Sequence, residues 1–302
     1  MGLFLTIPNI LIASMGKMSS VEEIMKARIT VLSENSVIKP GGFIGEHGFS
    51  ALVERGDEKV LFDTGQGYAL VHNARILGVD LASINKVVLS HGHNDHTGGL
   101  AELLRVGPER DIFAHPGIFD PRFREVTDGP PKPIGMPFTR SHLEGLGALF
   151  NLSDEPQKVA DGITTSGVVP RETDFETGDT TLLLGCEDGT CCPDPLSDDL
   201  SLIVEGEEGL VVVLGCAHSG LVNILNHVRD LKPDIPVKAV VGGTHLGLSG
   251  EEQMTRTIAA MAEMGIEKVG ASHCTGLAGS ARLREALGDS FFFAGVGSVL
   301  EV

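Results

Sequence analysis

The chain has 302 residues, of which 42% are hydrophobic and 21% are charged, and this composition is ordinary for a globular protein of one large domain. Its formal net charge of −18 repels polyphosphate backbones, which excludes a broad nucleic-acid-binding surface. A small phosphorylated substrate remains compatible with this charge, because a metal ion and one or two local cations can neutralise it.

Residues 1–27 are expected to form an N-terminal extension. The apolar run 3–13 is too short to span a bilayer, and Lys17 follows the run instead of preceding it, unlike the positive start of a signal peptide. Residues 20–23 (Ser-Val-Glu-Glu) resemble a capping box that opens a short helix. The sequence therefore predicts no membrane anchor.

The first half of the chain after this extension is rich in strands. Alternation and turn residues predict one helix at 68–77, and they predict strands at 28–32, 49–54, 59–62 and 86–90. A further helix is expected to begin at Gly98-Gly99. From about 115 to 197 the periodicity is weak and prolines cluster, although 163–169 and 181–184 could be strands. We interpret this stretch as an insertion or lid that carries substrate contacts.

The second half alternates strands with helices. A hairpin is expected from 200–204 and 210–214, followed by helices at 221–229, 251–264 and 281–287 and by strands at 237–241, 268–271 and 290–293. Hairpins followed by this alternation indicate an α+β protein with two packed sheets and helices outside them.

The five cysteines are odd in number and lack the spacing of a disulfide framework, which favours a reducing, cytoplasmic location. Cys186, Cys191 and Cys192 could form part of a metal site. This hypothesis of a cysteine metal site is disfavoured, because no matching Cys or His pair follows at zinc-ribbon spacing.

The clearest chemical signal lies directly after the strand at 86–90. Three imidazoles and one carboxylate occur within six residues, at His91, His93, Asp95 and His96. These groups suit zinc first, and also iron and manganese, while the carboxylate admits magnesium. Alternate residues after a strand can present the first two histidines to one ion, and the start of the next helix can offer Asp95 and His96 to a second. A histidine-rich surface loop would explain neither that strand nor the glycines that follow.

This segment resembles the HxHxDH signature of the metallo-β-lactamase fold superfamily, and Phe62-Asp63-Thr64-Gly65 resembles the aspartate motif that precedes it there. The resemblance covers residues 28–302. It implies an αββα sandwich of two mixed sheets flanked by helices, with an insertion or lid, and one or two divalent metal ions at an edge of the sheets.

Further motifs are similar to one branch of the superfamily, which includes the archaeal 7,8-dihydropterin-6-methyl-4-(β-D-ribofuranosyl)aminobenzene 5'-phosphate synthases. These motifs are Glu34-Asn35, Glu46-His47-Gly48-Phe49-Ser50, Asn73-Ala74, Gly215-Cys216-Ala217-His218-Ser219-Gly220, Gly242-Gly243-Thr244-His245-Leu246 and Ser272-His273-Cys274-Thr275-Gly276.

The resemblance implies that His91 and His93 hold a first metal ion, and that Asp95 and His96 hold a second together with His273. His218 follows a strand at the position where many relatives place a bridging aspartate. A neutral imidazole offers one lone pair and cannot bridge two ions. We therefore expect His218 to be a terminal ligand, of the first ion, and a one-metal site stays open.

Other residues have less certain roles. Asp199 is either a further ligand or a partner of one. Asp63 is expected to orient a ligand histidine by accepting its N–H, or else to cap a turn. Asp95 could also orient a water, and His245 could bind a phosphate or donate a proton, although a structural role is equally compatible.

His47, Asn35 and Thr275 are candidates for substrate binding. Cys216 and Cys274 stand beside site histidines and could be soft ligands, but a role as small buried residues is favoured.

Three functions are compatible with these residues. The first is a transferase that joins a dihydropterin to a phosphorylated aminobenzene riboside, with the metal binding the pyrophosphate leaving group. The second is a hydrolase of an ester, lactone or phosphodiester, in which the metal lowers the pKa of a bound water. The third is a non-catalytic domain that binds metal and a pterin-like ligand. This function is disfavoured, because the six candidate metal ligands are more than a structural metal site requires. A small phosphorylated or pterin-like molecule is the expected partner; the oligomeric state stays open.

Overall fold

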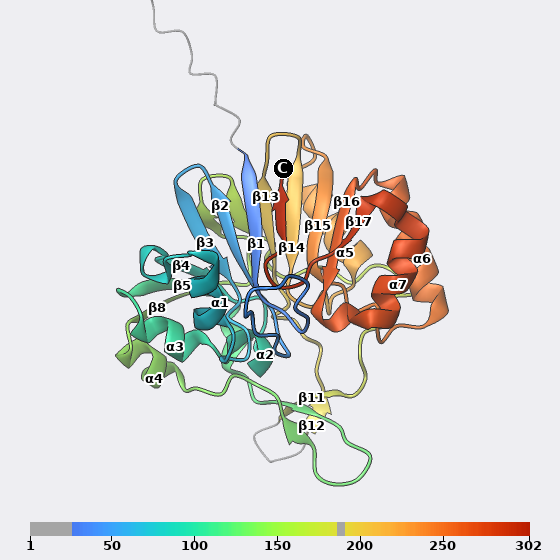
Figure 1. Ribbon diagram of the computed structural model, residues 1–302. Coiled ribbons are helices and arrows are strands. Elements are labelled where there is room, and N and C mark those ends of the chain that lie inside the picture. The colour runs from blue at the N-terminus through green and yellow to red at the C-terminus, as the bar shows by residue number, and fades with distance from the viewer. Residues whose placement is uncertain (1–25, 186–190) are drawn as a thin grey trace, which may run out of the picture.

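The computed structural model describes residues 26–185 and 191–302. Two seven-stranded sheets face each other across the centre of the molecule (Figure 1). The capping box expected at 20–23, nearly all of the expected N-terminal extension and Cys186 lie outside the described residues.

The first sheet has the strand order β18-β1-β2-β3-β4-β5-β8. Its strands are β1 (Ala27–Ser33), β2 (Ser50–Arg55), β3 (Glu58–Phe62), β4 (Lys86–Val88), β5 (Arg110–Ala114), β8 (Ala148–Leu152) and β18 (Val299–Glu301). Strands β18 to β3 pair antiparallel, whereas β3 to β8 pair parallel. The sheet is therefore mixed.

The second sheet has the order β17-β16-β15-β14-β13-β10-β9. Its strands are β9 (Lys158–Ala160), β10 (Ile163–Thr165), β13 (Ser201–Glu205), β14 (Leu210–Leu214), β15 (Val237–Gly243), β16 (Lys268–Ser272) and β17 (Phe291–Phe293). Strands β14 to β17 pair parallel, and β9 to β14 pair antiparallel. Every residue of β14 (Leu-Val-Val-Val-Leu) is buried, as expected for a strand covered on both faces.

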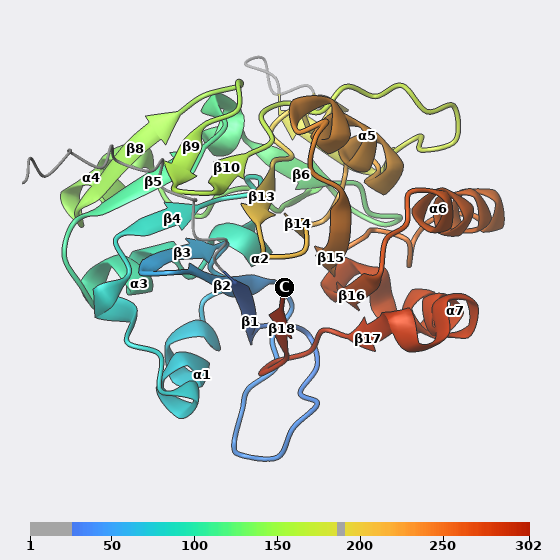
Figure 2. The ribbon, with the colours of Figure 1, turned by 90° about the horizontal axis from the view of Figure 1, so that it is seen from above.

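Helices cover the outer face of each sheet (Figure 2). Those beside the first sheet are α1 (Leu70–Leu77), α3 (Leu100–Arg105) and α4 (Arg140–Gly145), and those beside the second are α5 (Leu221–Leu231), α6 (Glu251–Glu263) and α7 (Gly276–Leu287). One apolar cluster fills the space between the sheets, with Phe62 and Val88 from one and Val211 and Val213 from the other. Two more lie beneath the helices. The predicted αββα sandwich of two mixed sheets is confirmed.

The stretch from 115 to 197 is more divided than the single insertion that we expected. Strand β8 extends the first sheet, and β9 and β10 extend the second. The other strands of this stretch form a separate four-stranded sheet, from β6 (Arg122–Arg124), β7 (Lys132–Pro133), β11 (Leu182–Gly185) and β12 (Cys191–Pro193). The strands expected at 163–169 and 181–184 overlap β10 and β11. Strands as short as β6, β7 and β12 show no period, so the sequence pattern did not separate these parts.

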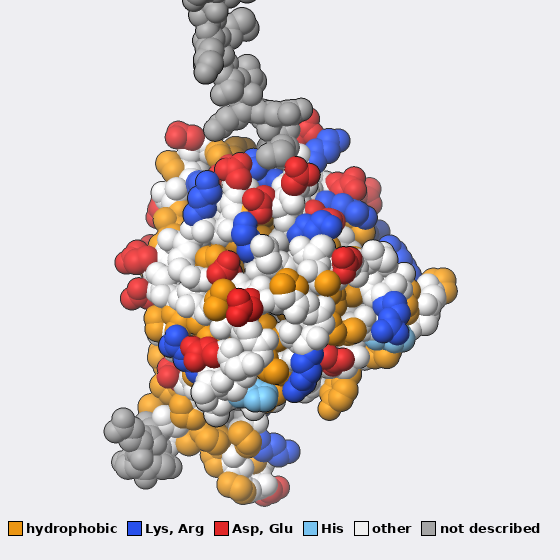
Figure 3. Space-filling view, turned by 90° about the vertical axis from the view of Figure 1, so that its left-hand side faces the viewer, with side chains coloured by type: hydrophobic (Ala, Val, Ile, Leu, Met, Phe, Trp, Pro, Cys, Tyr) orange, Lys and Arg blue, Asp and Glu red, His pale blue; other side chains and the backbone are white. Residues whose placement is uncertain are grey.

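This small sheet protrudes as a lobe below the two large ones (Figure 1). Hydrophobic side chains gather on the lobe in the face that Figure 3 shows, whereas acidic and basic side chains are interspersed elsewhere on that face. Cys191 and Cys192 lie on β12, and no described donor cluster suited to a metal includes them. Among the described residues, no helix is long and apolar enough to cross a membrane.

Candidate metal centre

The candidate ligands converge because the strands that precede them end at one edge of the sandwich. His91 follows β4, His218 follows β14, His245 follows β15 and His273 follows β16. Strands β14, β15 and β16 run parallel, so the segments at their carboxyl ends meet at one edge. Donor atoms far apart in the sequence are thereby brought within 4.8 Å of one another in several groups.

The first group comprises His91, His93 and His218, all buried. His91 Nε2 lies 3.0 Å from His93 Nδ1, and the ring of His218 lies 4.8 Å from that of His91. Two nitrogens bound to one tetrahedral zinc ion at 2.0–2.1 Å lie about 3.3 Å apart. Neither ring nitrogen of His218 has a hydrogen-bond partner, although the side chain is only 5% exposed. Buried polar atoms are seldom left without a partner, and a divalent ion fits these donors.

The second group surrounds Asp95. Its Oδ2 lies 3.1 Å from His47 Nε2 and 3.4 Å from His273 Nε2, and the three donors can share an ion. His96 Nε2 lies 3.2 Å from His273 Nε2. The ligand set inferred for a second ion from the resemblance is therefore brought together, with His47 beside it.

Asp63 and Ser90 hold two of these histidines in a fixed orientation. Asp63 Oδ2 accepts hydrogen bonds from the Ser90 hydroxyl and from His96 Nδ1, both at 2.7 Å. Ser90 Oγ in turn accepts from His91 Nδ1 at 2.8 Å. In the neutral form of each ring the proton lies on Nδ1, so that Nε2 offers a lone pair to the centre.

Asn35 and Glu34 do the same for His273. Asn35 Oδ1 accepts from His273 Nδ1 at 2.9 Å, and Glu34 Oε1 accepts from the His273 backbone N–H at 2.7 Å. Asn35 Nδ2 also donates to His47 Nδ1 at 3.2 Å. The side-chain amide of Asn35, a candidate for substrate binding, is therefore hydrogen-bonded to two histidines.

Burial keeps the first group neutral. It lowers the pKa of His93 to about 3. Burial, and then the neighbouring imidazoles, also lower the pKa values of His91 and His218 well below the usual range. Neutral imidazole is the form that binds a metal ion.

The second group carries more charge. Burial raises the pKa of Asp95, but His96 and hydrogen bonds from His273 and His47 outweigh it and bring this pKa well below the usual range. Burial lowers the pKa of His96, yet the carboxylates of Asp63 and Asp95 raise it to about 9. A proton on His96 therefore competes with an ion, and metal binding is expected to release it.

Asp199 points to the backbone and is in none of the described donor groups. Its Oδ2 accepts from the Ser219 N–H at 2.7 Å, which holds the segment that carries His218. Its neighbour Asp198, which was not among the predicted site residues, accepts from the Gly92 N–H at 2.7 Å and pairs with Arg122 at 2.9 Å. Burial, opposed by Arg122, raises the pKa of Asp198 to about 7.

Two cavities open beside the ligands. One, of about 540 Å³, extends from His218 and His245 toward α6. The other, of about 370 Å³, lies over His93, Asp95 and His273 and also includes His47. Four residues, Arg124, His218, His245 and Leu248, line both.

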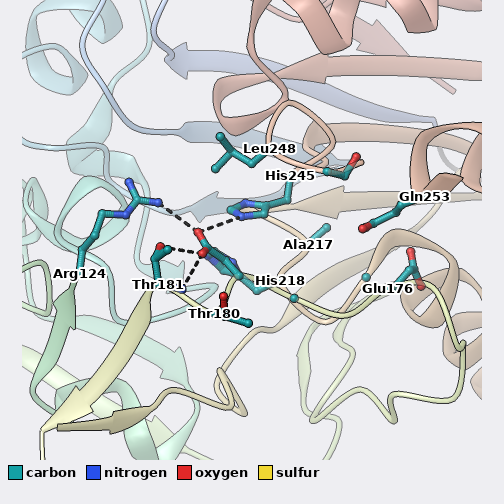
Figure 4. Close-up of a pocket in the computed structure, with 13 residues that line it drawn as sticks. Arg124, Glu176, Thr180, Thr181, Ala217, His218, His245, Leu248 and Gln253 are labelled. Atoms are coloured by element: carbon teal, nitrogen blue, oxygen red, sulfur yellow. Dashed lines mark hydrogen bonds and ion pairs between the residues drawn. The ribbon is translucent and has the colours of Figure 1, made fainter. Parts of the chain in front are cut away.

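Arg124 and His245 are both directed at the carboxylate of Asp179, and Figure 4 shows these two labelled side chains pointing toward one another. Arg124 Nη2 lies 3.2 Å from Asp179 Oδ2, whereas His245 Nε2 lies 3.9 Å away, which is an ion-pair distance and too long for a hydrogen bond. Burial lowers the pKa of His245, but Asp179 and Cys274 raise it to about 10. Asp179 gave no signal in the sequence, since it lies in an irregular segment far from the motifs.

Thr275, another substrate-binding candidate, lines neither cavity. Its fully buried hydroxyl accepts from the Thr244 N–H at 3.1 Å.

Backbone strain is concentrated near the candidate ligands. Five described residues other than glycine have a positive φ, and four of them are Asp63, Ala217, His245 and His273. Such strain is characteristic of functional sites.

Comparison with known proteins identifies the family. The family model described as "Metallo-beta-lactamase superfamily" matches residues 44–273. The chain belongs to this superfamily.

Its relatives in the superfamily include a 7,8-dihydropterin-6-methyl-4-(β-D-ribofuranosyl)-aminobenzene-5'-phosphate synthase from Methanocaldococcus jannaschii. The two sequences are 31% identical over 291 residues, which cover 93% of this chain and 99% of the relative. The crystal structure of Tm1679, a metal-dependent hydrolase of the β-lactamase superfamily, is 29% identical with a TM-score of 0.79 and covers 91% of this chain and 99% of that one.

Zinc-bound PqqB from Methylobacterium extorquens covers 91% of this chain and 100% of its own with a TM-score of 0.54. At 15% sequence identity, this likeness shows the common fold alone.

Proposed function

We propose that this metallo-β-lactamase-fold chain is a metal-dependent transferase that joins a dihydropterin to a phosphorylated small molecule. The name of the M. jannaschii synthase, which is similar over almost the whole chain, supports this reaction type. In such a reaction the amine of the acceptor forms a C–N bond to the pterin methylene carbon, the C–O bond to pyrophosphate breaks, and the amine loses a proton.

One observation carries the proposal: two cavities of about 540 and 370 Å³ adjoin each other and the candidate ligands. A reaction between two substrates needs two binding spaces that meet at the reacting atoms. Here they meet at His218 and His245, which line both. A hydrolase, whose second substrate is water, needs only one.

A bound divalent ion would supply Lewis-acid stabilisation of an anionic leaving group, and His91, His93, Asp95, His96, His218 and His273 would hold it or a pair of such ions. Arg124 is the one Lys or Arg among the described residues that line the two cavities, so it is placed to bind a phosphate. His245 has two ring nitrogens without a hydrogen-bond partner and can donate a proton to a phosphate oxygen.

The test is product formation from dihydropterin pyrophosphate and 4-(β-D-ribofuranosyl)aminobenzene 5'-phosphate. The purified chain would be supplied in turn with zinc, magnesium, manganese and iron(II), and coupled product would be measured together with pyrophosphate. We expect product with at least one metal and none with His91→Ala. No product with any metal would refute the transferase.

A metal-dependent hydrolase is the second candidate, favoured by the likeness to Tm1679 over 91% of this chain. Turnover of a panel of esters, lactones and phosphodiesters, abolished by a chelator and by His91→Ala, would support it. Coupling of the two substrates above without such turnover would exclude it.

A further inference from the structure

Cys216 lies at the centre of the cluster of candidate ligands. Its Sγ is the donor common to three groups, with His91 and His96, with His218 and His245, and with His273 and Cys274. In each group the donor atoms lie within 4.8 Å of one another. The residue lies two positions after the end of β14 and is 3% exposed.

These neighbours belong to both candidate ion positions. His91 and His218 are in the group assigned to the first ion, whereas His96 and His273 are in the set assigned to the second. Cys216 Sγ approaches His96 Nε2 to 3.3 Å. The sulfur therefore stands between two sets of ligands and does not belong to one side.

A thiolate differs from an imidazole in what it can do at such a position. A thiolate sulfur has several lone pairs and can bind two ions at once, while a neutral imidazole nitrogen has one. We propose that Cys216, as a thiolate, is the bridging ligand between two divalent ions, with His218 as a terminal ligand. This inference rests on the metal centre of the proposed function but not on which reaction it catalyses.

An independent observation supports an ion beside this sulfur, on the side of the first group. His218 has two buried ring nitrogens without a hydrogen-bond partner. His93 Nε2 also lacks a partner, and His93 is only 6% exposed. Buried imidazole nitrogens without partners are costly unless something absent from the bare chain satisfies them. An ion at this position, next to the Cys216 sulfur, would satisfy them.

Cys274 is the natural comparison, since it is the other thiol of the cluster. Its sulfur accepts from the His245 backbone N–H at 3.3 Å and lies 3.6 Å from the Cys216 carbonyl oxygen. It shares a donor group with Cys216 and His273 only, so it faces one side of the centre. Cys274→Ser therefore makes a matched control.

A bridging sulfur has a consequence for the choice of metal. Thiolate is a soft ligand that favours zinc, iron and cobalt, and it disfavours magnesium, which prefers oxygen. The centre is accordingly expected to take up two equivalents of zinc or cobalt and to discriminate against magnesium.

Cobalt(II) provides a readout that does not depend on turnover. The metal-free full chain would be titrated with cobalt, with the thiolate-to-cobalt charge-transfer absorption and the bound stoichiometry measured at each step. We expect this absorption to grow over both equivalents in the native chain and in Cys274→Ser. In Cys216→Ser it should be absent, and the second equivalent should bind about ten- to a hundredfold more weakly.

If Cys216→Ser folds poorly, Cys216→Asp provides a second test of the proposal. A carboxylate can also bridge two ions, so this variant should bind two equivalents without the charge-transfer absorption. The proposal is overturned if the absorption survives in Cys216→Ser, is lost in Cys274→Ser, or stops growing after one equivalent. Failure of the native chain to bind cobalt at all would refute the metal centre itself, whereas binding without the absorption would refute only the bridging thiolate.

Discussion

Asp63 controls two ligand histidines through one carboxylate. It is fully buried, adopts a φ of 58°, and accepts from His96 and from the hydroxyl and N–H of Ser90. Asparagine tolerates this backbone conformation, so Asp63→Asn keeps the turn but places an amide N–H₂ or a single oxygen where three donors converge.

Metal affinity should therefore fall about ten- to a hundredfold in Asp63→Asn, because the orientation and basicity of the ligands depend on this carboxylate. Competition with a chromophoric chelator would measure the affinity. Asp57→Asn, at an exposed hairpin turn, should leave it unchanged. Equal affinities for the two variants would show that Asp63 only caps its turn.

Arg124 is the residue we expect to bind the phosphate group of the substrate. Arg124→Gln keeps a polar side chain but removes the charge, and a hydrogen bond to a charged group contributes about 1.5–3 kcal/mol. The KM for the phosphorylated substrate should rise about ten- to a hundredfold with kcat little changed. Steady-state kinetics would measure both constants.

Arg140→Gln is the control for Arg124→Gln, because Arg140 is similarly exposed, pairs with Glu144 and lines neither cavity. Lys132 and Arg171 also line neither cavity. A fall in kcat with unchanged KM in Arg124→Gln would argue against a role in substrate binding.

At the scale of elements, the loop between β3 and α1 depends on Glu46. Its carboxylate accepts from the backbone N–H groups of four consecutive residues, 66 to 69, and from the Ser33 hydroxyl. Helix α1 has no side-chain cap of its own. Glu46 thus serves as the cap from a distance and places negative charge at the helix N-terminus, where the dipole favours it.

Glu46→Gln should lower the free energy of unfolding by about 2–4 kcal/mol, because an amide N–H₂ then faces backbone donors in a buried site. Urea denaturation of the metal-free chain would measure this loss. Glu144→Gln, on the exposed surface of α4, should change stability by less than about 0.5 kcal/mol. A similarly small effect in Glu46→Gln would show that water can replace the carboxylate.

The elements that the sequence predicted well are those with a clear period or composition. The strand expected at 210–214 is β14 (Leu210–Leu214), and the helix expected at 251–264 is α6 (Glu251–Glu263). Strands β6, β7 and β12 have two or three residues and no period of their own. They exist because neighbouring segments supply hydrogen bonds, and a local pattern does not contain that information.

The candidate site shows the same contrast between local sequence patterns and contacts that only the fold creates. His91, His93, Asp95 and His96 are close in sequence, so their pattern alone indicated a metal. Cys216, Asp198 and Asp179 acquire meaning only from neighbours up to 120 residues away, as between Cys216 and His96. Pairing of that kind is set by how the two sheets pack, and the sequence read locally could not reveal it.

At the scale of the molecule, the candidate metal ligands come from both sheets. His91, His93 and His96 follow a strand of the first sheet, whereas His218 and His273 follow strands of the second. An ion bound between them should therefore stabilise the packing of one sheet on the other. At a free metal concentration of a hundred times the dissociation constant, binding to the folded state alone contributes about 2.7 kcal/mol.

We accordingly expect zinc to raise the urea midpoint of the native chain and a chelator to reverse the change. His218→Ala removes a ligand from the second sheet and should lose most of the increment, even though His91 and His93 remain. His142→Ala, on the exposed surface of α4, should keep all of it. If His218→Ala retained the full increment, binding of the ion would not depend on His218, and this residue would not link the two sheets through the ion.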